Sequence, residues 1–159
     1  MVLAEATQRA IERLVYEWAR AVDENRLEDL AGLLAEDGEY KVASRYNLDR
    51  ALPLAVIHTR SRSQLRDRIT SLRVANIYEA HCYRHLVSGV QVIGEADGAF
   101  EVRSNYAVIR IMEHDGASSI FSTGEYRDSV VFEGAAPRFR RRHVVFDSKA
   151  IDTLLVYPL

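Results

Sequence analysis

The second half of the chain alternates between apolar and polar residues with a period of two, and this feature most narrows the folds open to it. Four runs share the alternation, at residues 83–93, 100–112, 120–132 and 139–146. The turn signals Ala96-Asp97-Gly98, His114-Asp115-Gly116 and Glu133-Gly134 with Pro137 separate these runs. The pattern predicts four long antiparallel strands connected as a meander.

The first half has apolar residues at spacings of three and four, the period of an amphipathic helix. Ile11, Leu14, Val15, Trp18 and Val22 predict a first helix over residues 4–23.

A second apolar stripe follows and predicts a helix over residues 25–38, with Asn25 and Glu28 as a capping box and Gly38 as its end. The stripe consists of Leu27, Leu30, Leu33 and Leu34. A short strand at 39–46 and an irregular connection at 47–62 should come next. Ser63 is predicted to cap a third helix, whose apolar positions are Leu65, Ile69 and Leu72.

Helices followed by a meander of strands are typical of an α+β fold. We expect the N-terminal helices to pack on one face of a curved, mostly antiparallel sheet, with a cone-shaped hollow between the two layers. Neither an internal repeat nor a linker rich in Pro, Gly or Ser divides the chain, so we expect residues 1–159 to form a single domain.

Composition argues against several classes of partner. A net charge of −2 gives no general attraction to nucleic acid or to anionic lipid. Charged residues interrupt the apolar pattern of residues 1–20, which excludes a signal segment or a spanning helix there. The single cysteine, Cys82, cannot form an internal disulfide, and we therefore expect a cytoplasmic protein. One thiolate also cannot hold an iron–sulfur cluster alone.

Two groups of residues resemble ligand sites. His81 and His85 have the spacing of a helical metal pair, but the surrounding pattern is that of a strand, which separates them by about 13 Å; no metal site is therefore expected. The arginines at 140–142 and His143 could suggest a phosphate site. On a strand, however, Arg141 and His143 face one side while Arg140 and Arg142 face the other.

An enzymatic alternative remains open. Asp23, Tyr40, Asp147 and either His81 or His85 could assemble an acid/base set inside the hollow. The chain would then be a free-standing dehydratase or isomerase of this fold. A small-ligand binding module is a third hypothesis and has no motif behind it.

Strings of residues along nearly the whole chain resemble the small (β) subunits of Rieske-type aromatic-ring-hydroxylating dioxygenases. The strings are Asp67-Arg68-Ile69, residues 76–79 and 83–88, Ser104-Asn105-Tyr106, residues 124–128, residues 141–147 and the C-terminal residues 152–159. Within that family the chain is most similar to subunits of enzymes that act on benzoate-like acids, the salicylate, anthranilate and terephthalate group. Residues 76–79, Arg110-Ile111-Met112 and Pro158-Leu159 carry this narrower resemblance.

The resemblance implies a cystatin-like, NTF2-like cone and a non-catalytic structural role. It also implies a hexamer of three large (α) and three small subunits. The large subunit would carry a Rieske [2Fe–2S] cluster and a mononuclear iron, and this chain would carry no catalytic residue, metal or cofactor. We expect an interface with the large subunit because aromatic and arginine side chains are enriched in interface cores. The expected interface residues are Tyr78, Glu79, Tyr83, Arg84, His85, Arg141 and His143.

Overall fold

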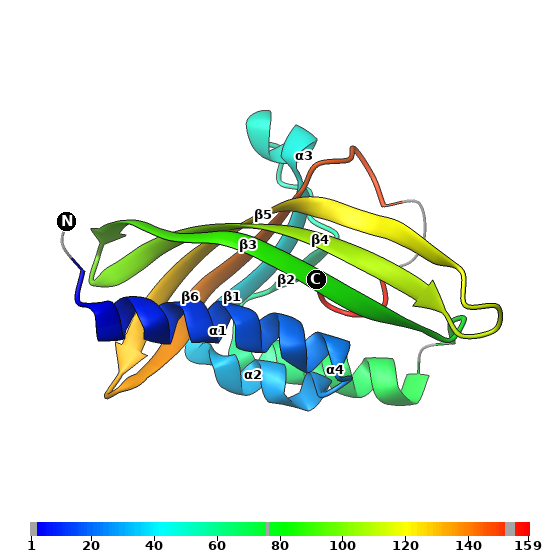
Figure 1. The fold of residues 1–159 in the computed structure, drawn as a ribbon, viewed down its shortest axis with the longest axis horizontal. Coiled ribbons are helices and arrows are strands. Elements are labelled where there is room, and N and C mark those ends of the chain that lie inside the picture. The colour runs from blue at the N-terminus through cyan, green and yellow to red at the C-terminus, as the bar shows by residue number, and fades with distance from the viewer. Residues whose placement is uncertain (1–2, 76, 152–154) are drawn as a thin grey trace.

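The first helix packs its apolar stripe against the sheet. The computed structural model describes residues 3–75, 77–151 and 155–159. Helix α1 (Glu5–Asp23) confirms the predicted first helix, and all five residues of its stripe are buried. Figure 1 shows α1 lying along one face of the sheet. Burial of this stripe supplies the hydrophobic driving force for the contact.

Within the described ranges, six strands form one open sheet in the order β2-β1-β6-β5-β4-β3. The four predicted long strands are confirmed and extend further than the pattern indicated. They are β3 (His81–Ala96), β4 (Ala99–Met112), β5 (Ser118–Glu133) and β6 (Ala136–Phe146). These four pair antiparallel, whereas β1 (Leu34–Ser44) pairs parallel with β6 and antiparallel with β2 (Ile57–Thr59).

The predicted turns form tight hairpins. Asp97 and Gly98 both have positive φ angles, 51° and 71°, as the two-residue turn between β3 and β4 requires. Gly116 and Gly134 supply the left-handed residue at the next two turns.

The predicted second helix is wrong over most of its length. Only a short 3₁₀ turn, η1 (Leu27–Asp29), and one helical turn, α2 (Leu30–Leu33), form before β1 begins at Leu34. Gly38 lies inside β1, where an added Cβ would be 2.8 Å from the carbonyl oxygens of both Ala35 and Phe139. This glycine is thus required by a close approach to β6 and does not end a helix.

Asn25 and Glu28 do not form the predicted capping box. Asn25 has a φ of 58°, and its side-chain oxygen accepts a hydrogen bond from Arg73 Nη1 at 2.8 Å. Glu28 accepts from Arg73 Nε at 2.7 Å. The two residues therefore connect the end of α1 to helix α4 (Arg62–Ala75).

Helix α3 (Arg45–Asp49) begins within the predicted strand and continues into the segment predicted as irregular, which also contains strand β2 and the start of α4. The cap of α4 is also corrected: Ser61 Oγ, and not Ser63, accepts the backbone N–H of Gln64 at 3.2 Å. The apolar positions of the third helix are confirmed as buried, namely Leu65, Ile69 and Leu72.

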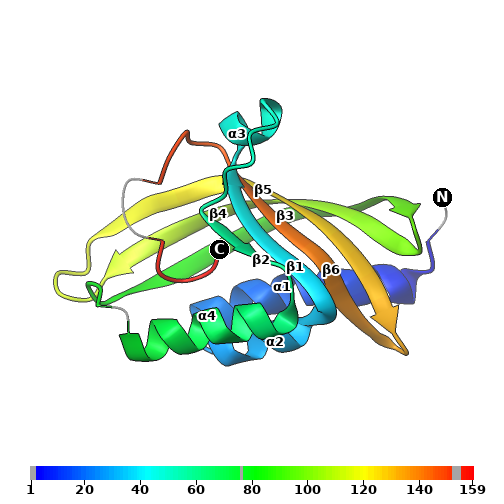
Figure 2. The ribbon, with the colours of Figure 1, turned by 180° about the vertical axis from the view of Figure 1, so that it is seen from behind.

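The predicted α+β architecture is confirmed. Helices α1, α2 and α4 cover the concave face of the curved sheet, and α3 projects beyond its opposite side (Figures 1 and 2). The main hydrophobic core lies between the helices and this face. In Figure 2 the C-terminal segment, in red, ends between the sheet and the helices.

Candidate functional site

Aromatic side chains occupy the interior of the cone. The ring centroids of Trp18 and Tyr40 are 5.0 Å apart, and those of Tyr106 and Tyr126 are 4.7 Å apart. Phe139 contacts Trp18 edge to face at 5.9 Å. These rings, contributed by α1 and four different strands, are all buried and pack as a core.

One ion pair lies within this aromatic core. Arg142 Nη1 donates to Asp128 Oδ2 at 2.8 Å, and neither side chain is exposed. The Arg142 guanidinium also lies 3.9 Å above the ring of Tyr126. Burial raises the pKa of the Asp128 carboxyl to about 7, although the charge of Arg142 opposes the shift.

The proposed acid/base set is only partly assembled. Asp23 accepts the backbone N–H of His85 at 2.9 Å and lies 2.6 Å from His85 Nδ1. Tyr40, by contrast, hydrogen-bonds the backbone of Leu159, and Asp147 contacts Arg45 and Thr123 outside the cone. The Asp23–His85 contact connects the end of α1 to β3, and the other groups do not converge on it.

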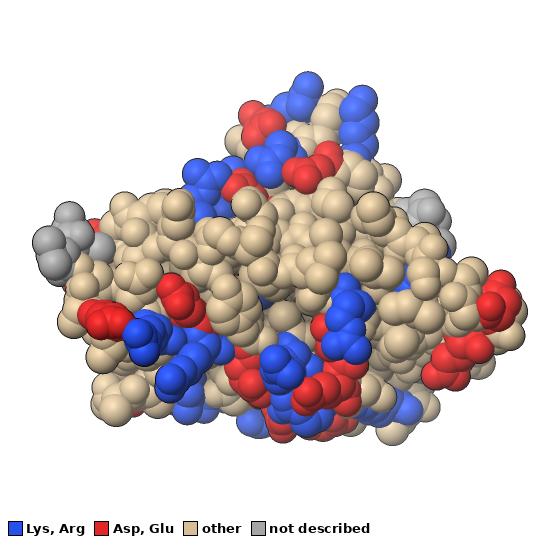
Figure 3. Space-filling model, viewed as in Figure 1, with Lys and Arg blue, Asp and Glu red and all other residues tan. Residues whose placement is uncertain are grey.

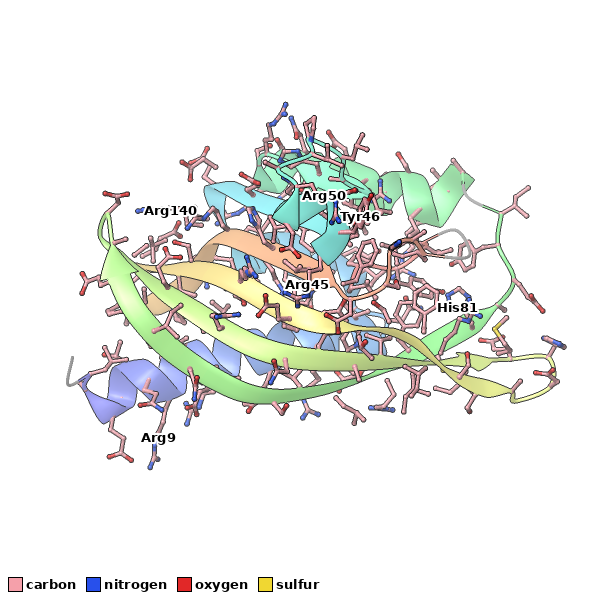
Figure 4. The ribbon with its side chains drawn as sticks, turned by 90° about the horizontal axis from the view of Figure 1, so that it is seen from above. Arg9, Arg45, Tyr46, Arg50, His81 and Arg140 are labelled. Atoms are coloured by element: carbon pink, nitrogen blue, oxygen red, sulfur yellow. The ribbon has the colours of Figure 1, made fainter. Side chains whose placement is uncertain are left out.

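His81 does not join that pair. Its Nδ1 lies 2.6 Å from the carbonyl oxygen of Glu79, and its ring contacts those of Tyr78 and Tyr83. Figure 4 shows His81 at the start of β3, beside the C-terminal segment. The described residues contain no group of three or more His, Cys, Asp or Glu side chains that could hold a metal ion. The described side chains therefore do not supply the ligand set of a Rieske cluster or of a mononuclear iron.

The predicted interface residues at the start of β3 alternate between the two faces of the sheet. Arg84 is 66% exposed, with Asp23 3.8 Å away, and the exposed Glu79 pairs with His114 at 2.9 Å. Tyr78 is half-buried. Tyr83 and His85 face inward, and the Tyr83 residue is only 2% exposed. Side chains without exposed surface cannot contact a partner directly in this conformation.

The predicted division of the arginine run is observed for residues 141–143. Arg140, predicted to share the face of Arg142, lies instead at a register shift between β5 and β6 and donates to the carbonyl oxygen of Asp97 at 2.9 Å. Arg142 faces inward, whereas Arg141 and His143 face outward. Arg141 pairs with Glu101 at 3.1 Å, and His143 Nε2 lies 2.7 Å from Glu39 Oε1. Burial lowers the pKa of His143, and the Glu39 carboxylate offsets only part of that effect.

A cluster of charged residues on the outer face of the sheet was not predicted from the sequence. The Glu125 carboxylate accepts hydrogen bonds from Arg103, from Arg127 at 2.8 Å and from Arg45 at 3.2 Å. Burial raises the pKa of Glu125, but the three arginines lower it more, to about 2. Figure 4 shows Arg45 reaching over the sheet from α3. The only sequence signal was the spacing of Glu125 and Arg127, which places both side chains on one face of β5.

Charged side chains are distributed unevenly over the surface. Figure 3 shows them around α3 and over the helical layer, with a broad uncharged band between them. Leu86 and Ile120 are among the exposed apolar residues of β3 and β5. Among the described residues, no helix is both long enough and apolar enough to cross a lipid bilayer.

Comparisons with known proteins match most of the chain. Residues 5–143 match the SnoaL-like domain family. The chain is 36% identical over 138 residues to the anthranilate 1,2-dioxygenase small subunit of Burkholderia cepacia. This match covers 87% of this chain and 85% of that protein. It is 35% identical over 143 residues to a β subunit of the terephthalate 1,2-dioxygenase terminal oxygenase component of Comamonas sp., covering 89% and 92%.

A solved structure gives the same result at the level of the fold. It is described as the β subunit of an aromatic-ring-hydroxylating dioxygenase from Novosphingobium aromaticivorans DSM 12444. Its TM-score is 0.86 at 31% identity, and the match covers 96% of this chain and 97% of that one.

Proposed function

Because the chain belongs to the SnoaL-like family, and within it to the small subunits of aromatic-ring dioxygenases, we propose that it assembles the catalytic large subunits of an oxygenase for an aromatic carboxylic acid. The observation that carries the proposal is its identity of 36% and 35% to the small subunits of anthranilate and terephthalate dioxygenases. Both relatives are named for aromatic acids.

The iron chemistry is assigned to the large subunit. We propose that this partner holds a Rieske [2Fe–2S] cluster and a mononuclear iron. The single cysteine of this chain, together with the lack of a metal-binding group among its described residues, supports that division. When bound in the partner, the two iron centres would supply the electron transfer and the oxygen activation.

The proposed assembly is a hexamer of three large and three small subunits in the cytoplasm. A closed ring fixes the position of one large subunit relative to the next, as symmetric interfaces do in other oligomers. The role of this chain is then to bury surface against its neighbours.

The outward-facing part of the predicted interface carries the contact. Arg84, Glu79 and Arg141 are exposed, and Tyr78 and His143 are half-buried. We propose that these five side chains contact the large subunit. Tyr83 and His85 act only indirectly, because they hold β3 against the core.

Co-expression with a Rieske large subunit of the benzoate-like group tests this function. We expect one stable complex whose mass, measured by light scattering, corresponds to three copies of each chain. A complex of another stoichiometry would contradict the hexamer alone. A folded chain that remains separate from every such large subunit would contradict the proposed function.

A further inference from the structure

The C-terminal residues 155–159 lie inside the cone without joining the sheet. Leu155, Val156 and Leu159 are buried, and Leu159 has no exposed surface. These residues belong to no helix or strand. The segment is therefore held by side-chain packing and by a few polar contacts, as a bound peptide would be.

Two polar groups of the core hold the backbone of Leu159. The Trp18 indole N–H donates to the carbonyl oxygen of Leu159 at 3.1 Å. The Tyr40 hydroxyl accepts the N–H of Leu159 at 2.9 Å and lies 3.3 Å from its carbonyl oxygen. Burial raises the pKa of Tyr40, so this hydroxyl keeps its proton and can donate while it accepts.

A group of rings surrounds the phenol of Tyr157. Its ring centroid lies 5.6 Å from that of Tyr78, 5.0 Å from His81 and 5.5 Å from Tyr83. The Tyr157 hydroxyl donates to the Tyr78 hydroxyl at 3.1 Å. We call Tyr78, His81 and Tyr83 the phenol box; it contacts the partly buried ring of Tyr157 and provides one hydrogen-bond partner for its hydroxyl.

Two more polar atoms, one in the phenol box and one next to it, are free to form hydrogen bonds. The Tyr83 hydroxyl and His85 Nε2 are buried and have no partner among the described residues. The ring centroids of Tyr83 and His85 are 6.2 Å apart, so these groups lie in the same part of the cone. Buried polar atoms normally have partners, and these two are therefore suited to a polar ligand.

We propose that residues 155–159 are an internal ligand of the cone, and that their release opens a site for a small substituted phenol in the phenol box. The site shares Tyr78 with the proposed contact surface for the large subunit, but it does not depend on the oxygenase assignment. The side chain of Tyr157 defines the class of ligand, because the box already contacts a phenol.

The single tryptophan makes the test direct. Trp18 donates to the segment itself, so its fluorescence should change when the segment leaves. A specific protease site is inserted between Lys149 and Ala150, which are both exposed, and the chain is cut after it has folded. The uncut chain with the same insertion is the control.

A synthetic peptide of residues 150–159 is then titrated into the cut chain after its own segment has been removed. We expect a saturable 1:1 change in Trp18 emission. p-Cresol, the side-chain analogue of tyrosine, should displace the peptide and should bind the cut chain but not the uncut control. A Tyr157→Ala peptide should bind about tenfold more weakly, the equivalent of about 1.4 kcal/mol.

Three outcomes would overturn the proposal. In the first, a scrambled peptide binds as tightly as the native one. In the second, the cut chain remains folded by circular dichroism but binds neither peptide nor p-cresol. In the third, the chain unfolds as the segment leaves, which would make residues 155–159 part of the core and not a ligand. If cutting fails, a Tyr157→Ala chain should bind p-cresol, and a folded variant that does not would also contradict the proposal.

Discussion

Two carboxylates show how residue environment sets opposite pKa shifts in one sheet. Asp128 is enclosed by the aromatic core with one cation, Arg142, whereas Glu125 lies on the other face with three arginines. Burial dominates for Asp128 and raises its pKa, while the arginines dominate for Glu125 and lower its pKa. The two residues are three positions apart, yet they should respond to different ranges of pH.

The Asp128→Asn variant tests the raised pKa. The folded chain retains a proton up to about pH 7 that the unfolded chain releases near pH 4. The stability due to protonation is therefore complete below about pH 4 and is lost as the pH rises through about 7. Between these values, the free energy of unfolding should fall by up to about 1.4 kcal/mol per pH unit, and Asp128→Asn should lack this slope.

Urea unfolding at pH 5, 6 and 7 measures the slope. Glu133→Gln, which changes an exposed carboxylate on the same strand, should keep it. Identical slopes for the wild type and Asp128→Asn would show that Asp128 is ionised throughout this range.

The Glu125→Gln variant tests the lowered pKa. Because the folded pKa is about 2 and the ordinary value is 4.5, Glu125 stabilises the fold above about pH 4.5. That stability is lost as the pH falls through about 2. The variant should lose about 1 kcal/mol at pH 7, a modest value because water screens the partly exposed arginines, and it should unfold less steeply on acidification. An acid titration followed by circular dichroism measures this, with Glu95→Gln as the exposed control. Parallel unfolding curves for the wild type and both variants would contradict the lowered pKa of Glu125.

At the scale of elements, the pairing of β5 with β6 depends on a glycine. A Cβ added at Gly124 would lie 2.0 Å from the carbonyl oxygen of Val145 and 2.9 Å from Phe146 Cα. Both neighbours are backbone atoms of β6, so relief requires the two strands to separate.

Gly124→Ala should therefore destabilise the protein by about 3 kcal/mol, near the upper end of the usual cost of overpacking. The matched control is Gly94→Ala, because Gly94 is also in a strand and its added Cβ would meet no atom within 4 Å. Thermal unfolding of the two variants should separate them clearly. Equal melting temperatures would mean that the β5–β6 approach is looser than the structure indicates.

The elements that the sequence predicted correctly are those in which local pattern and tertiary packing agree. α1 and the four long strands keep their characteristic period over most of their length, although β-bulges interrupt the strands, and tight turns separate the strands. The helix predicted over residues 25–38 failed because Leu34 pairs with Phe139 of β6, a contact more than a hundred residues away. The leucine spacing is compatible with a helix that continues through Leu34 and with a strand that begins there. Only the distant pairing with β6 decides between the two.

The candidate site was predictable to a smaller extent. The outward direction of Arg84 and Arg141 follows from strand alternation, given the inward faces of Tyr83 and Arg142. The Glu125 cluster could not be inferred, because Arg45 approaches it from a helix that the sequence pattern did not reveal. The position of residues 155–159 inside the cone likewise depends on Trp18 and Tyr40, which are remote in sequence.

At the scale of the whole molecule, the interior of the cone is filled, so the proposed contact with the large subunit uses the outer surface. Aromatic rings, a buried ion pair and the C-terminal residues occupy the space between the helices and the sheet. This agrees with the proposed role, in which the chain contributes to an oxygenase by holding the large subunits in place. The exposed start of β3 is where we expect that contact to be most sensitive to mutation.

Arg84→Ala tests this expectation without disturbing the core. The Arg84 side chain is 66% exposed, and its contact with Asp23 is long, at 3.8 Å, so the fold should lose little stability. If Arg84 is buried against the large subunit, its removal would leave a desolvated group of that subunit without a partner. We therefore expect association with the large subunit to weaken about tenfold. Arg9→Ala is the matched control, because Arg9 pairs with Glu5 near the N-terminal end of α1, far from the start of β3 (Figure 4). Analytical ultracentrifugation of the co-purified subunits should show dissociation for Arg84→Ala alone; equal dissociation of both variants would place the interface elsewhere on the molecule.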